Sequence, residues 1–186
     1  MVFIPTLWLP ILLSAVLVFV ASAVVHMVLG YHWSDFKSIP NEERVQDALR
    51  KEGLAPGDYM LPRPASHKEM SSPDVIEKFK KGPVAVMTVF PSGPPSMGKQ
   101  LVNWFLFCLA VSVAVAYLTG RTLGPDAAYL AVFRVAGTSA FYAHAFGRVI
   151  ESVWMGRSWM TTAKNVFDGL LYALVTAGSF GWLWPN

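Results

Sequence analysis

The chain has 186 residues, of which 54% are hydrophobic and 15% are charged, and its formal net charge is +3. A mean hydropathy of +0.42 is too apolar for an ordinary soluble domain, so the composition predicts a membrane protein. The single cysteine, Cys108, excludes intrachain disulfides and metal sites built from several cysteines.

Four apolar stretches lie at residues 5–29, 101–119, 127–150 and 165–184. Each is close to the roughly 20 residues that a helix needs to cross the hydrocarbon core of a bilayer. We therefore expect an all-α membrane bundle of four transmembrane helices. Its predicted parts are helix 1 (1–29), a small soluble α/β insertion (30–99) and helices 2–4 (100–186, with the last helix at about 164–184).

The first apolar stretch also has a feature of a signal peptide. Residues 19–23 contain small side chains at a spacing that a signal peptidase cleaves. However, no Lys or Arg precedes Lys37, and the apolar run continues to Leu29. The stretch therefore predicts a retained transmembrane helix.

The insertion, residues 30–99, holds most of the charged residues and alternates two kinds of pattern. Residues 41–51 and 73–81 predict helices, the second with Ser72 as its N-cap and Pro73 at its first position. Residues 58–61 and 84–90 predict extended segments, giving the order helix, strand, helix, strand. Few apolar residues are available for a core, so we expect this domain to be stabilised by contact with the membrane or with a partner.

A near-match to a phosphate-binding loop ends the insertion, at residues 93–100. It has the glycines and the lysine of G-x-x-x-x-G-K-[ST], but Gln100 supplies no hydroxyl for magnesium. Pro94 and Pro95 also remove two backbone N–H donors. The segment therefore predicts a linker, and no other catalytic motif occurs, so we expect no enzyme activity, no catalytic residues and no metal site.

The basic residues near the ends of the apolar stretches predict the orientation. One side of the predicted membrane has only Arg121, whereas the other has Lys37, Lys99, Arg148, Arg157 and Lys164. The positive-inside rule then places residues 30–99 in the cytoplasm and both termini outside the inner membrane. The basic charge beside the membrane suits anionic lipid, and no pattern for nucleic-acid binding is present.

Polar residues inside the apolar stretches predict a cluster of His26, His144, Arg148 and Asp168 near the cytoplasmic end. If the last two helices are antiparallel, Arg148 and Asp168 lie at equal depth, which predicts an ion pair between them. One alternative is that His26 and His144 are axial ligands of a b-type haem, by analogy with membrane anchors of redox enzymes. A second alternative is a small transporter or proton path that uses Arg134 and Asp168.

Small residues recur at every fourth position of the last three apolar stretches, a spacing that lets membrane helices approach closely. This pattern, together with the weakly cored insertion, predicts a non-enzymatic accessory or assembly subunit that packs against other subunits of a larger membrane complex. The stripes are Ser112, Ala116 and Gly120; Ser139, Ala143 and Gly147; and Gly169, Ala173, Ala177 and Gly181.

Overall fold

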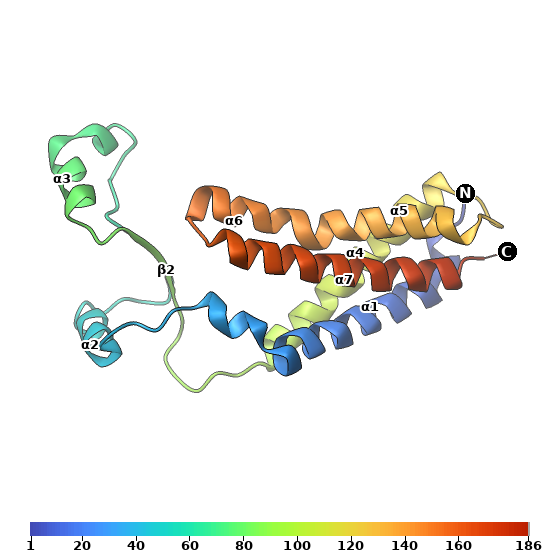
Figure 1. Cartoon of the computed structure of the whole chain (residues 1–186), viewed down its shortest axis with the longest axis horizontal. Helices are drawn as coiled ribbons and strands as arrows, with labels where there is room; N and C mark the ends of the chain where they lie inside the picture. Colours follow the sequence, from blue (N-terminus) through green and yellow to red (C-terminus); the bar gives the residue numbers. More distant parts are fainter. Residues whose placement is uncertain (186) are drawn as a thin grey trace. The chain divides into compact units, whose positions relative to one another are not determined.

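The computed structural model describes residues 1–185, which are mostly helical with one two-stranded sheet. The chain divides into two compact units (Figure 1). We call residues 1–37 together with 96–186 the helical unit, and residues 38–95 the inserted unit. The insertion is shorter than the expected 30–99, because residues 30–37 and 96–99 belong to the helical unit.

The helical unit consists of four long rods of helix. The first rod joins η1 (Ile4–Leu7), α1 (Trp8–Ala23) and η2 (Val24–Leu29), and the second is α4 (Gly98–Thr122). The third rod joins α5 (Tyr129–Phe141), η5 (Tyr142–Phe146) and α6 (Gly147–Met155), and the fourth is α7 (Trp159–Trp182). Two of them, Ile4–Leu29 and Gly98–Thr122, are long and apolar enough to cross a membrane. Figure 1 shows α5 and α6 running alongside α7.

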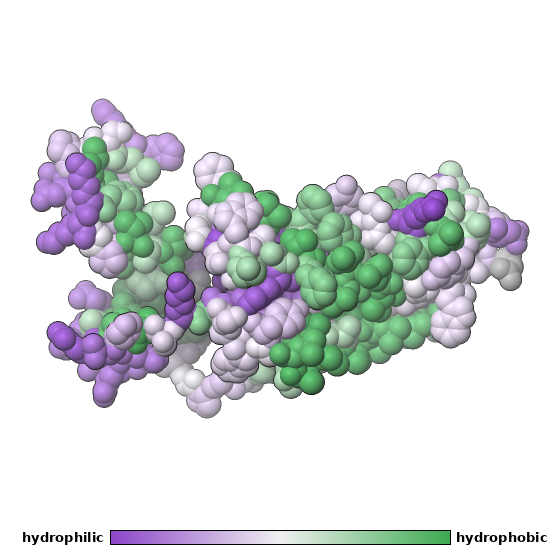
Figure 2. Space-filling model, viewed as in Figure 1, coloured by the Kyte–Doolittle hydropathy of each residue, from purple (hydrophilic) through white to green (hydrophobic). Residues whose placement is uncertain are grey.

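Small and β-branched side chains fill the core between the rods, including Ala15, Val115, Ala136 and Ala177. Two side-chain hydrogen bonds join α1 to α4: Ser14 Oγ to Ser112 Oγ at 2.9 Å, and Trp104 Nε1 to Ser22 Oγ at 2.7 Å. Large apolar side chains cover much of the outer surface of this unit (Figure 2). The unit is thus closely packed inside and apolar outside.

Two of the rods contain a π-helical segment, in which the backbone makes one wider turn. These segments are η2, which carries His26, and η5, which carries His144. A π-helical turn places one extra residue within the helix and rotates the side chains that follow it. Neither segment is predicted from the sequence, where uniform α-helical spacing is the expectation.

The inserted unit has the order helix, strand, helix, strand. Its elements are α2 (Glu42–Lys51), β1 (Gly57–Leu61), the short 3-10 turn η4 (Glu69–Ser71), α3 (Pro73–Lys81) and β2 (Ala85–Val89). The Ser72 hydroxyl accepts a hydrogen bond from the Val75 N–H, as expected of an N-cap. β1 and β2 pair antiparallel, with Met60 opposite Val86.

Candidate functional site

The site is formed where the segment after the first rod folds back against α7. Gly30 ends η2 with a left-handed backbone conformation (φ 61°), which glycine adopts without strain. The chain then forms a 3-10 helix, η3 (Tyr31–Asp35), whose side chains meet α7 near Lys164 and Asp168. Residues about 130 positions apart in the sequence are thereby brought into contact.

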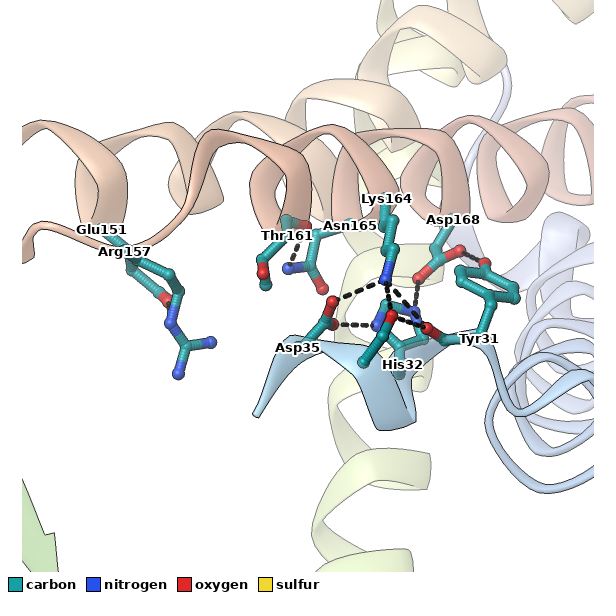
Figure 3. A network of polar contacts seen from close by, with 10 residues as sticks. Tyr31, His32, Asp35, Glu151, Arg157, Thr161, Lys164, Asn165 and Asp168 are labelled. Carbon is teal, nitrogen blue, oxygen red and sulfur yellow. Dashed lines mark hydrogen bonds and ion pairs between the residues drawn. The ribbon is translucent and has the colours of Figure 1, made fainter. Parts of the chain in front are cut away.

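The imidazole ring of His32 lies between two carboxylates (Figure 3). Its Nδ1 is 2.6 Å from Asp35 Oδ2, and its Nε2 is 2.8 Å from Asp168 Oδ2. The second oxygen of Asp168 accepts a hydrogen bond from the Tyr31 hydroxyl. Asp168 is only 3% exposed, so these two neighbours replace the water that a buried carboxylate loses.

Lys164, on α7, forms the other contacts between α7 and η3. Its ammonium donates to Asp35 Oδ1, to the Tyr31 carbonyl and to Ser34 Oγ, each at 2.8 Å. Burial alone would raise the pKa of Asp35, but the hydrogen bonds and charges of Lys164 and His32 outweigh it and hold that pKa below its ordinary value. Burial and the bond to Asp168 raise the pKa of the Tyr31 hydroxyl. Asp35 is therefore ionised and Tyr31 is a neutral donor at neutral pH.

A cavity of about 570 Å³ adjoins this network inside the helical unit. Its polar lining comes from several rods and includes His26, His144, Arg148, Glu151, Asp168 and Tyr172. The ring of His26 is 4.7 Å from the ring of His32, centroid to centroid. His144 lies among the aromatic rings of Trp104, Phe107 and Tyr172.

The four residues of the predicted polar cluster, His26, His144, Arg148 and Asp168, all line this one cavity. The ion pair expected between two of them is not formed among the described residues. Asp168 pairs with His32, and Arg148 Nη1 lies 3.0 Å from Glu151 Oε1 on its own helix. Equal depth is not sufficient for pairing: the π-helical turn at 142–146 shifts the face on which Arg148 lies, and Arg148 remains about half exposed.

The small-residue stripes fall into two groups. The α7 stripe lies at the contact with α5 and η5: a Cβ on Gly169 would lie 2.9 Å from the Ala145 Cβ, and one on Gly181 would lie 2.6 Å from the Tyr129 ring. Ala173 and Ala177 are buried beside them. Ser112, Ala116 and Gly120 on α4 are also buried. In the stripe at Ser139, Ala143 and Gly147, the last two are exposed and border the cavity. On that rod, Ala136, Ala140 and Ala145 are buried instead, because the π-helical turn changes the spacing from four to five.

Arg134, proposed with Asp168 as part of a proton path, is exposed on α5 and does not line the cavity that Asp168 lines. The roles of Tyr31, His32 and Asp35 are not predicted from the sequence. Their one local signal is the spacing of His32 and Asp35, three residues apart directly after a glycine that can end a helix.

Comparison of the chain with protein-family models, curated proteins and solved structures finds no match.

Proposed function

We propose that this chain is a multi-pass inner-membrane protein that acts as a non-enzymatic accessory or assembly subunit, and that its inserted unit docks on a partner subunit in the cytoplasm. The observation that carries the proposal is the apolar surface of the inserted unit, which its own fold leaves uncovered. The helical unit supplies the membrane anchor.

All four rods are proposed to cross the bilayer. α7 has 24 residues, which at 1.5 Å per residue gives about 36 Å, enough for a hydrocarbon core of about 30 Å. Lys164 and Asp168 are the sixth and tenth residues of α7, so Asp168 lies close to the middle of the helix. Both side chains are paired with groups of η3, which lowers the cost of placing them in a membrane. Apolar side chains such as Ile150, Leu170 and Leu174 occupy the outward surface of the third and fourth rods.

The inserted unit has very little core of its own. Among its described residues only Val75 is buried. On one face of the sheet Met60 and Val86 are cross-strand neighbours, 46% and 53% exposed. Figure 2 shows apolar side chains uncovered in this unit. A two-stranded sheet is marginal in water by itself, and each strand has a free edge that can pair with another chain.

The docking proposal predicts that the apolar sheet face contacts a protein. A photoreactive benzophenone side chain placed at Val86 or Met60 in living cells should give, after irradiation, an adduct with one protein of defined mass. The same group at Glu52, an exposed polar position of the inserted unit, is the matched control and should give none. Mass spectrometry of the adducts identifies the partner.

The double variant Met60→Glu with Val86→Glu should reduce the amount of native complex by about tenfold or more. Burying one such side chain contributes about 1.5–3 kcal/mol, and 1.4 kcal/mol is a factor of ten in affinity. Adducts with lipid alone, or wild-type protein that migrates on native gels without any other protein, would overturn the docking proposal.

The proposed topology predicts a simple labelling pattern. Cysteines introduced at Ser66 and Ser158 should be protected from an impermeant thiol reagent in intact cells, whereas one at Pro125 should be labelled, because basic residues near the helix ends are concentrated on the side of Ser66 and Ser158. The native Cys108 is buried and should give little background. Labelling at Ser66 with protection at Pro125 would reverse the orientation.

One observation favours a second candidate function, the haem-binding anchor. His26 and His144 lie on different rods and line the same cavity, as two axial ligands of a haem would. An absorption spectrum of the purified protein tests haem binding. A Soret band that is lost in His144→Ala supports it, and the absence of a Soret band after purification from haem-replete cells rejects it.

A further inference from the structure

We propose that His26, His32 and Asp168 form a site for one divalent transition-metal ion of the Zn²⁺ type. One ligand atom from each of the three lies within 4.8 Å of the others. The inference goes beyond the accessory-subunit function and does not depend on it, because all three residues belong to the helical unit; it is an alternative to the haem-binding candidate, which uses the same His26.

The donor set suits such an ion. Two imidazole nitrogens and one carboxylate oxygen are common ligands of zinc, with bond lengths of about 2.0–2.2 Å. Bonds of that length at tetrahedral angles separate two ligand atoms by about 3.3 Å. His32 Nε2 and Asp168 Oδ2 are 2.8 Å apart, so they would separate by about half an ångström as the ion takes the place of the proton between them. His26 is exposed, and binding requires its ring to turn toward them.

The groups around these ligands form hydrogen bonds that would hold the ligands in position around an ion. Asp35 accepts from His32 Nδ1, which turns Nε2 toward the ion in the carboxylate–histidine–metal arrangement. Tyr31 donates to the Asp168 oxygen that faces away from His32, and Lys164 holds Asp35 in place. Each of the two inner ligands is thereby fixed by a neighbour of its own.

A bound metal ion would also give each ring nitrogen of His32 a suitable partner. A neutral imidazole has one N–H, so it can donate to only one of the two carboxylate oxygens beside its ring nitrogens. A bound cation allows the neutral imidazole, with Nδ1–H donated to Asp35 and the lone pair of Nε2 on the ion. His26 makes no hydrogen bond among the described residues and would gain a partner.

The proposed site is open on one side. His26 and Asp168 both line the 570 Å³ cavity, so an ion held between them faces it. Three protein ligands leave at least one coordination position, which is the feature that separates reactive or exchangeable zinc sites from closed structural ones. Water, or a small ligand that enters the cavity, would occupy that position.

The experiment uses the full chain, purified in detergent with a tag that contains no histidine and freed of metal with EDTA. Isothermal titration with Zn²⁺ should show one ion per chain, and Co²⁺ should give the visible absorption bands of a low-coordinate complex. The variant His26→Ala should weaken Zn²⁺ binding by tenfold or more with little loss of thermal stability, since His26 is exposed and makes no hydrogen bond among the described residues. Asp35→Asn should weaken it by about 10–100-fold through the outer shell.

His67 provides the control. His67→Ala, in the inserted unit, should leave Zn²⁺ affinity within about twofold of the wild type. The proposal is overturned if the wild type binds no stoichiometric Zn²⁺, if His26→Ala and His32→Ala both bind as well as the wild type, or if His67→Ala removes the binding. A purely structural network predicts a loss of stability in His32→Ala but no change of any variant in metal affinity.

Discussion

Replacing Asp168 by leucine is expected to lower the free energy of unfolding of the metal-free protein by about 3–5 kcal/mol, the usual result of removing one partner from a buried charged pair. The change leaves His32 without the carboxylate at Nε2 and leaves the Tyr31 hydroxyl without its acceptor. Unfolding in mixed detergent, followed by tryptophan fluorescence, measures the loss.

The double variant Asp168→Leu with His32→Leu should recover much of that loss, since Asp35 keeps Lys164 and no buried charge is left unpaired. Arg148→Leu is the matched control and should change stability by less than about 1 kcal/mol, because the Arg148–Glu151 pair is half exposed. If Arg148→Leu and Asp168→Leu cost the same, and their effects are not additive, the originally expected pair between them exists instead.

The second large effect is expected at the contact between α7 and η5. A Cβ added at Gly169 would lie 2.9 Å from the Ala145 Cβ and 3.1 Å from the Ala145 backbone, which cannot move as the end of a flexible side chain can. Gly169→Val must therefore push the two helices apart and should cost about 1–3 kcal/mol. The same unfolding measurement applies.

Gly178 provides the matched control on the same helix. Nothing lies within 4 Å of a Cβ at that position, so Gly178→Ala should be neutral or stabilising by up to about 1 kcal/mol, the helix propensity difference. Equal stability of Gly169→Val and the wild type would mean that α7 and η5 do not approach each other closely.

The sequence predicts best what is decided locally. The elements of the inserted unit follow from caps, turns and alternation within about ten residues, as the Ser72 cap shows. The apolar stretches likewise locate all four rods. That His26, His144, Arg148 and Asp168 line one cavity follows from their depth along the helices, which the rise per residue supplies.

Partners were harder to predict, because pairing depends on the rotation of each helix as well as on depth. The π-helical turn at 142–146 changes that rotation. Its residues are all compatible with an α-helix, so the sequence does not predict the turn. His32 was missed for a different reason: its contact with Asp168 depends on the chain reversing at Gly30, a tertiary arrangement that no short pattern encodes.

The contact between Tyr31 and Asp168 joins residues 137 positions apart, and the inserted unit lies within that loop of chain. The entropy lost on closing a flexible loop rises only with the logarithm of its length, so that a doubling adds about 0.6 kcal/mol. A much shorter chain between the first two rods would change the entropy cost of the contact between η3 and α7 only slightly. The length of chain between the first two rods is therefore not set by the closure of the helical unit, and the inserted unit could become longer or shorter without preventing that closure.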